Sequence, residues 1–164
     1  MNQPLVTPTL SDRMKMYEHS FDSTIPAVSP VIIRIDGKAF RTFTVDCEKP
    51  FDTELSNAMI STAKFLLSEV QSAIAAYTFS DEISLLIDRA GPTSQIFFNG
   101  NLNKMVSVSA SFATAYFNSI YSPPSSFTLK PTKTDNKLAF FDSRAFLIPK
   151  YETVNYFIWR QSDC

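Results

Sequence analysis

The chain has 164 residues, of which 45% are hydrophobic and 19% charged, and its net charge is −1. This length and balance are typical of one globular domain with a hydrophobic core, and they show no overall basic charge that would indicate nucleic-acid binding. The 3 scattered glycines exclude a glycine-rich phosphate loop, and 1 histidine with 2 cysteines excludes a zinc site or catalytic triad built on them.

The N-terminal part of the sequence predicts an arm helix followed by a buried strand. Residues 9–12 resemble a capping box, which predicts a short helix over residues 10–19. The β-branched run of residues 31–35 predicts a buried strand. This strand ends at Asp36-Gly37, where glycine permits a sharp turn, and no regular element is predicted directly after it.

The middle of the chain predicts a helix, a hairpin and a second helix. The first helix has Asp52 as a candidate N-cap, and both helices show apolar residues at helical spacing. Only Ser80, Asp81 and Glu82 separate the two strand-like runs, which is short enough for a hairpin tip. The four elements are a helix over residues 53–71, strands over 73–79 and 83–87, and a helix over 101–119.

The C-terminal part predicts a further strand region and a last helix. Residues 95–98 predict a brief extended segment, and residues 122–136 a surface loop or disordered stretch rich in serine and proline. Two apolar runs flank residues 142–144, which predicts a bent strand or a hairpin between 138 and 148. A last helix is predicted to start near Tyr151.

The order of these elements predicts an α+β fold. Strand, helix, hairpin, helix and strand form a β-α-β-β-α-β pattern, which closes as an antiparallel sheet of four or more strands with helices on one face. Right-handed crossovers place the first and third strands side by side in the centre. Asp36 at the end of the first strand is therefore expected beside Asp81 and Glu82 at the hairpin tip.

Three carboxylates gathered at one sheet edge favour a divalent cation. Uncompensated carboxylates repel one another, and Mg²⁺ accepts one or two of them together with water and substrate phosphates. Because neighbouring strand residues point to opposite faces, we expect Asp81 to be a ligand with Asp36, and Glu82 to be more peripheral. The residues alone leave open that Asp36-Gly37 and the hairpin tip are only polar turns.

Four ordered motifs resemble those of the tRNA-His guanylyltransferase family and its Thg1-like relatives. They are residues 34–40 (Arg-Ile-Asp-Gly-Lys-Ala-Phe), 76–84, 141–144 and 159–164, in a similarity that runs from about residue 10 to the end. Family members commonly carry Gly-Gln where this chain has Thr78-Phe79. The resemblance implies a ferredoxin-like polymerase palm that adds nucleotides to the 5′ end of tRNA in the 3′–5′ direction, as processing or repair.

The resemblance also implies the chemistry and the partners. ATP activates a 5′-monophosphate end, and the 3′-hydroxyl of an incoming GTP or other nucleoside triphosphate then attacks it, with two Mg²⁺ ions serving both steps. The partners are thus tRNA and nucleoside triphosphates. The full-length family assembles as homo-oligomers, dimers or tetramers. We expect a soluble, intracellular (cytoplasmic) protein with no membrane partner, because no basic-then-apolar leader opens the chain and no apolar run reaches the roughly 18 residues of a span.

Carried over by motif position, the resemblance implies roles for particular residues. Asp36 and Asp81 are metal ligands, joined by the backbone carbonyl of Gly37, and Glu82 is a further acidic residue needed for activity. The backbone amides of residues 38–41 hold triphosphate oxygens, as a tight turn after a strand can. The implied nucleotide contacts are Gly37, Lys38, Ala39, Phe40, Arg41, Lys49, Ser80 and Lys104, the two lysines 49 and 104 to phosphates.

The domain organisation and two alternatives follow from the same comparison. We predict a palm with an N-terminal helical arm over residues 1–150 and the start of a C-terminal helical region over 151–164, truncated relative to the family. One alternative is an inactive palm-type module that binds nucleotide or assists assembly. The other is a palm used for cyclase-like nucleotidyl transfer, against which the hairpin tip counts, because it lacks a Gly-Gly-Asp/Glu-Glu/Asp-Phe sequence.

Overall fold

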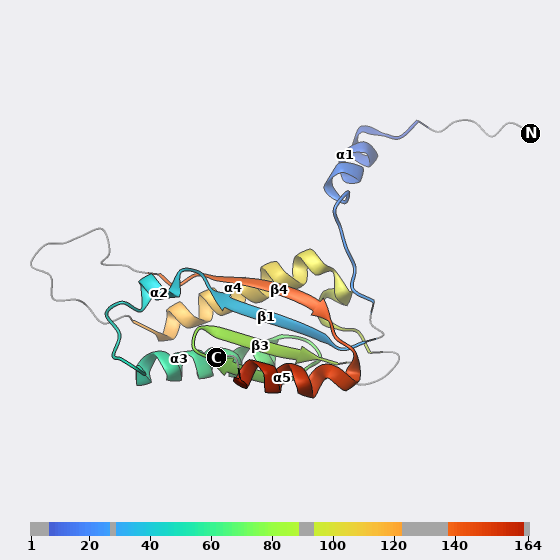
Figure 1. Cartoon of the computed structure of the whole chain (residues 1–164). Coiled ribbons are helices and arrows are strands. Elements are labelled where there is room, and N and C mark those ends of the chain that lie inside the picture. Colours follow the sequence, from blue (N-terminus) through green and yellow to red (C-terminus); the bar gives the residue numbers. More distant parts are fainter. Residues whose placement is uncertain (1–6, 27–28, 89–93, 123–137, 163–164) are drawn as a thin grey trace, which may run out of the picture.

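The computed structural model describes residues 7–26, 29–88, 94–122 and 138–162 of the chain. A four-stranded antiparallel sheet lies between two long helices on one face and a shorter helix on the other (Figure 1). The elements in order are α1 Leu10–Glu18, β1 Val31–Gly37, α2 Phe40–Phe43, α3 Thr53–Glu69, β2 Ala73–Phe79, β3 Glu82–Ile87, α4 Leu102–Ile120, β4 Phe141–Leu147 and α5 Thr153–Ser162, with 3₁₀ turns at Phe97–Gly100 and Lys150–Glu152.

The strand order is β2-β3-β1-β4, which confirms that the first and third strands lie side by side in the centre. Asp36 of β1 is directly opposite Glu82 of β3 and Asp142 of β4. Residues opposite each other in antiparallel strands project from the same face of the sheet. The register therefore brings three acidic side chains to one face, near the end of β1.

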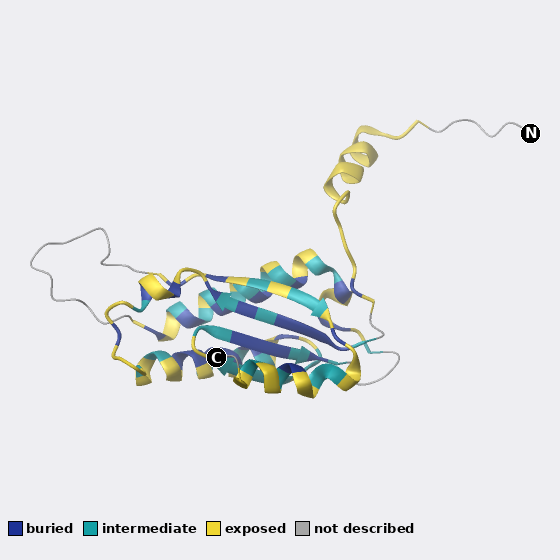
Figure 2. Cartoon of the chain, viewed as in Figure 1, coloured by how far each residue is buried: buried dark blue, intermediate teal, exposed yellow. Residues whose placement is uncertain are grey.

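The hydrophobic core lies on the opposite face, under α3 and α4. Val31, Ile33 and Ile35 point into it from β1 and are completely buried, as Leu66 of α3 and Phe117 of α4 are. Figure 2 shows β1 and β3 as the most buried strands, flanked by helices that are buried only on their inner sides. This confirms the prediction that two helices cover one face of the sheet.

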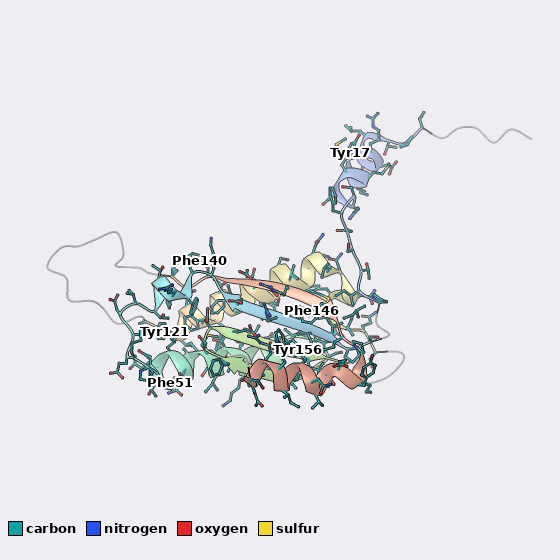
Figure 3. All side chains as sticks on the ribbon, in the orientation of Figure 1. Tyr17, Phe51, Tyr121, Phe140, Phe146 and Tyr156 are labelled. Carbon is teal, nitrogen blue, oxygen red and sulfur yellow. The ribbon has the colours of Figure 1, made fainter. Side chains whose placement is uncertain are left out.

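The helix α5 covers part of the other face, a position that the sequence analysis does not foresee. Its Tyr156 is 7% exposed and packs with Ile32 of β1 and with Phe146 of β4, at a ring distance of 5.9 Å from Phe146 (Figure 3). The Tyr156 hydroxyl also lies 2.9 Å from the Ser84 hydroxyl of β3. The predicted division at residue 150 stays a prediction, although α5 packs directly on the sheet.

An aromatic cluster anchors the turn that follows β1. The Phe117 ring, at the cluster's centre, lies 5.0 to 6.2 Å from the rings of Phe40, Phe43, Tyr121 and Phe141. Phe40 and Phe43 come from α2, the short helix that starts directly after the turn. A Cβ at Gly37 would overlap the Phe40 ring, so the close approach of this turn to the core requires glycine.

The N-terminal helix α1 extends away from the sheet (Figure 1), and none of its residues is buried. Its capping box is confirmed: the Asp12 backbone N–H donates to the Thr9 hydroxyl at 3.2 Å, and the Thr9 backbone N–H to the Asp12 carboxylate at 3.0 Å. The helix is therefore stabilised locally rather than by packing. None of the helices in the described ranges is long and apolar enough to cross a membrane.

Several local expectations are corrected. The region predicted as a bent strand or hairpin forms one continuous strand, β4, since residues 142–144 pair with β1 along their whole length. The expected extension at 95–98 runs into a 3₁₀ turn, and the last helix begins at Thr153 after another such turn. Most of the loop predicted at 122–136 lies outside the described residues.

The aromatic cluster gives a stability prediction. Phe117→Ala removes a ring that is 0% exposed and is expected to lower the free energy of unfolding by about 3–5 kcal/mol, because it leaves a cavity. Urea unfolding followed by circular dichroism measures the change. Phe21→Ala is the matched control, because Phe21 is 89% exposed and its loss is expected to change stability by less than about 0.5 kcal/mol. Equal effects of the two changes would contradict the cluster's role.

Candidate active site

A cluster of carboxylates lies where β1, the β2–β3 turn and β4 meet. The Gly37 backbone N–H donates to the Asp81 carbonyl at 3.1 Å, which holds the hairpin tip beside the end of β1. The pKa of Asp36 is raised above its ordinary value, first by burial and then by the negative charges of Asp81, Glu82 and Asp142. The structure therefore brings the three predicted carboxylates together and adds a fourth.

Glu82 differs from the other carboxylates because its carboxylate forms ion pairs with two arginines. Arg160 of α5 donates from Nε to Oε1 and from Nη2 to Oε2, both at 2.8 Å, and the Nε of Arg34 lies 3.5 Å from Oε2. The Ser84 hydroxyl also donates to Oε1, at 3.3 Å. By contrast, Asp36 and Asp81 form no ion pair within the described part of the chain. Those two remain the candidate metal ligands.

The turn after β1 has the backbone conformation expected near a phosphate, with one difference. Ala39 is left-handed, with φ 57°, and it precedes Phe40 and Arg41, the first residues of α2, whose amides have no partner within the helix. The Lys38 amide, which we predict to hold triphosphate, instead donates to the Phe140 carbonyl at 2.8 Å. The Phe40 ring is buried in the core, so only the backbone of Phe40 can face a ligand.

A pocket of about 290 Å³ opens beside this turn. Arg41 and Lys49 line it together with Ser80 and Asp81. The Lys49 ammonium donates to the Thr44 carbonyl at 3.1 Å, and the Ser80 hydroxyl to the Asp81 carboxylate at 3.0 Å. The residues that line the pocket include two cations, Arg41 and Lys49, and three carboxylates, Glu48, Asp52 and Asp81. Asp52 accepts hydrogen bonds from the backbone N–H groups of Glu48 and Leu55, and the two cations beside Asp81 suit a polyphosphate that carries a metal ion.

Lys104 lies away from this cluster, and its predicted contact with phosphate stays a prediction. It lies in the first turn of α4, where its backbone N–H donates to the N-cap Asn101 at 2.9 Å. The site lies beside a later turn of α4, at Thr114. The Thr114 hydroxyl accepts a hydrogen bond from the backbone N–H of Phe141, which lies opposite Gly37 in the sheet. Ten helical residues, about 15 Å, separate Lys104 from Thr114.

Sequence reasoning missed two residues of the cluster. Asp142 raises the pKa of Asp36 from the neighbouring strand, and Arg160 neutralises Glu82 from a helix more than 70 residues away in sequence. Both lie inside motif blocks noted above, but their roles depend on the register of β4 and on the position of α5. A single continuous strand over residues 141–147 would have indicated that Asp142 and Asp36 are paired.

The donor set fits Mg²⁺ rather than a metal enclosed by protein. Within the described ranges, no group of three or more His, Cys, Asp or Glu side chains is arranged to hold a metal ion. Mg²⁺ needs no such group, since it takes one or two carboxylates and fills its other positions with water and substrate phosphates. A cation at Asp36 and Asp81 would also offset the burial and the neighbouring negative charges that together raise the pKa of Asp36.

Comparisons with known proteins agree with this arrangement. A family model described as "Thg1: tRNAHis guanylyltransferase" matches residues 11–149. Uncharacterized protein R259 of Acanthamoeba polyphaga mimivirus is 32% identical over 98% of this chain and 60% of its own length. The tRNA(His) guanylyltransferase of Schizosaccharomyces pombe is 34% identical over 92% of this chain and 54% of its own length. The chain thus spans between half and two thirds of these curated relatives.

Two solved structures resemble the fold. A bacterial tRNA(His) guanylyltransferase (Thg1)-like protein in complex with GTP superposes with a TM-score of 0.83 at 44% identity, over 94% of this chain and 70% of that one. The tRNA(His) guanylyltransferase of Saccharomyces cerevisiae gives a TM-score of 0.69 at 27% identity, over 90% of this chain and 64% of that one. These likenesses confirm the predicted α+β palm.

The carboxylate cluster predicts a pH-dependent effect of Asp36→Asn. Because the folded-state pKa of Asp36 is raised, its ionisation costs stability as pH rises through that pKa, and below the ordinary aspartate pKa the cost is absent. Asp36→Asn is therefore expected to raise the thermal midpoint of the metal-free protein at neutral pH and to change it little near pH ~3. Thermal unfolding in EDTA across this range measures the difference.

The matched control for that experiment is Asp46→Asn, because Asp46 is exposed and lies outside the cluster. The control is expected to show no stabilisation that grows with pH. A lower midpoint for Asp36→Asn at neutral pH would mean that Asp36 stabilises the metal-free fold, and it would contradict the repulsion argument.

Proposed function

The chain belongs to the tRNA(His) guanylyltransferase family, and we propose that it is a nucleotidyltransferase that adds nucleotides to the 5′ end of tRNA in the 3′–5′ direction. The observation that carries the proposal is the pair Asp36 and Asp81 beside a pocket with Arg41 and Lys49. Carboxylates for a cation and side-chain cations for a polyphosphate are the two needs of phosphoryl transfer. Bacterial Thg1-like proteins with this fold have been solved in complex with GTP and with ATP.

In this proposal, Asp36, Asp81 and the Gly37 carbonyl hold Mg²⁺, as two ions when nucleotide is bound. When bound, Mg²⁺ supplies activation of the attacking oxygen and stabilisation of the leaving phosphate. Arg41 and Lys49, which line the same pocket, bind and orient the polyphosphate. The Phe40 and Arg41 amides donate to phosphate oxygens, and the anchored aromatic cluster keeps that turn in place.

The order of chemistry follows the family. The 5′-monophosphate of the tRNA attacks the α-phosphorus of ATP, which forms a phosphoanhydride to AMP and releases pyrophosphate. The 3′-hydroxyl of an incoming nucleotide such as GTP then loses its proton and attacks the activated 5′ phosphorus, which forms a phosphodiester bond and releases AMP. Repair of shortened 5′ ends, with or without a template base, is the use we propose. We also propose that the chain acts as a homo-oligomer. These steps are proposals, as is the tRNA partner, because the chain spans only part of its relatives' length.

The test is incorporation of nucleotide at an RNA 5′ end. The purified chain is incubated with 5′-monophosphorylated tRNA that lacks its first nucleotide and carries a label at that phosphate, with ATP, all four nucleoside triphosphates and Mg²⁺. Asp81→Asn is expected to lower extension and Mg²⁺-dependent nucleotide binding by at least about 100-fold, because it removes one of two carboxylate ligands. Asp46→Asn, an exposed aspartate outside the pocket, is the matched control.

The outcomes separate the proposal from its alternatives. Extended product that Asp81→Asn abolishes supports the 3′–5′ nucleotidyltransferase. Nucleotide binding that depends on Asp81, without product, indicates instead a palm-type nucleotide-binding module, and product formed without RNA indicates cyclase-like transfer. Normal Mg²⁺-nucleotide binding by both Asp36→Asn and Asp81→Asn would show that the metal site lies elsewhere.

A further inference from the structure

The contact between Glu82 and Arg160 joins the last turns of α5 to the ends of the central strands, where the candidate metal site lies. Arg160 makes two hydrogen bonds of 2.8 Å to the two carboxylate oxygens, and its side chain is 13% exposed against 12% for Glu82. The Arg160 guanidinium also lies over the Trp159 ring, 4.8 Å from its centroid. A nearly buried, two-pronged ion pair of this kind has a defined geometry, unlike a solvated surface pair.

The register would otherwise make Glu82 a member of the metal cluster. Glu82 lies directly opposite Asp36 on the same face of the sheet, and its charge contributes to the raised pKa of Asp36. Arg34 alone cannot hold Glu82 in the same way, because its buried Nε lies 3.5 Å from the carboxylate and makes no hydrogen bond in the structure. Arg160 therefore decides where the Glu82 carboxylate points.

The pair also sets the charge beside the cluster. Glu82, Arg34 and Arg160 together carry a net charge of +1, whereas Glu82 with Arg34 alone would be neutral. A unit charge near the site acts in opposite directions on a bound cation and on a bound polyphosphate. Adding positive charge weakens cation binding and strengthens polyphosphate binding, and removing it does the reverse.

We infer that Arg160 is a positioning residue that holds Glu82 out of the Asp36–Asp81 site and thereby sets the balance between cation and polyphosphate affinity there. This inference rests on the proposed function, since it assumes that Asp36 and Asp81 bind a cation. It also gives the Glu82 position a role that requires no direct contact with metal or substrate.

Removing Arg160 is expected to leave α5 docked. Tyr156 anchors the same helix through its buried ring, which packs against Phe146 without involving Glu82 or Arg160, and Phe157 of α5 packs beside Tyr77 of β2. The hydrophobic core lies on the other face of the sheet and does not involve Arg160. The role of Arg160 in binding can therefore be tested in a folded protein.

The test is a double-mutant cycle with two probes, Mn²⁺ alone and inorganic tripolyphosphate alone, at low salt. Arg160→Met is expected to raise Mn²⁺ affinity about threefold to tenfold and to lower tripolyphosphate affinity by a similar factor. Glu82→Gln is expected to shift both affinities in the opposite directions. The double variant returns the local charge to +1 and is expected to restore both affinities to within about twofold of the wild type.

Arg160→Lys keeps the charge but loses the two-pronged contact, and it is the matched control for charge alone. It is expected to change both affinities less than Arg160→Met. A merely structural role would weaken both probes together and would not be reversed by Glu82→Gln. Either of those results would overturn the inference. If Arg160→Met does not fold, Glu82→Gln and Arg160→Lys still test it, because an unchanged Glu82→Gln would overturn it alone.

Failure of the proposed function has a different signature. If the wild-type chain binds no Mn²⁺, or binds it equally well after Asp36→Asn, the proposed metal site is wrong and the inference falls with it. If the wild type binds Mn²⁺ through Asp36 but Arg160→Met shifts neither affinity, only the role assigned to Arg160 is wrong.

Discussion

Repulsion between carboxylates at the end of β1 is the constraint on which the site depends. Asp36 is placed opposite Glu82 on one side and Asp142 on the other, and like charges in such positions are unfavourable. The sheet cannot escape by slipping one residue, because that would turn Ile33 and Ile35 out of the core. The relief must come from positive charge, which Arg160 supplies at Glu82 and which, in our proposal, a cation supplies at Asp36.

The same constraint explains why the neighbouring turn is built so rigidly. A cation between Asp36 and Asp81 is useful only if a polyphosphate reaches it in a defined position. Phe40 ties the start of α2 to Phe117, and the Gly37 backbone N–H ties the hairpin tip to the end of β1. The first connection joins the backbone of the turn to the core, and the second joins it to the hairpin tip.

The sequence predicts the sheet, its strand order and the meeting of Asp36 with Asp81, because these follow from hydrophobic periodicity and the handedness of crossovers. It does not predict which backbone amides already have a hydrogen-bond acceptor within the protein, or which basic side chains lie far from the site. The Lys38 amide is used by Phe140, and Lys104 lies at the far end of α4; both facts depend on tertiary register. Arg160 was visible as part of a motif, but its partner became clear only when α5 was placed on the sheet.

One face of the sheet carries the hydrophobic core, and the other carries the charged groups of the candidate site. The face under α3 and α4 holds nearly all the fully buried apolar side chains among the described residues, so it carries the hydrophobic stabilisation. The face under α5 can then hold acidic and basic groups whose mutual balance is adjusted without disturbing that core. Tyr156, the Glu82–Arg160 pair and the Phe157 ring, which lies 6.3 Å from the Tyr77 ring of β2, are among the contacts that connect α5 to this face. Because the core does not need those contacts, their arrangement can be set by the charge that a bound ligand requires.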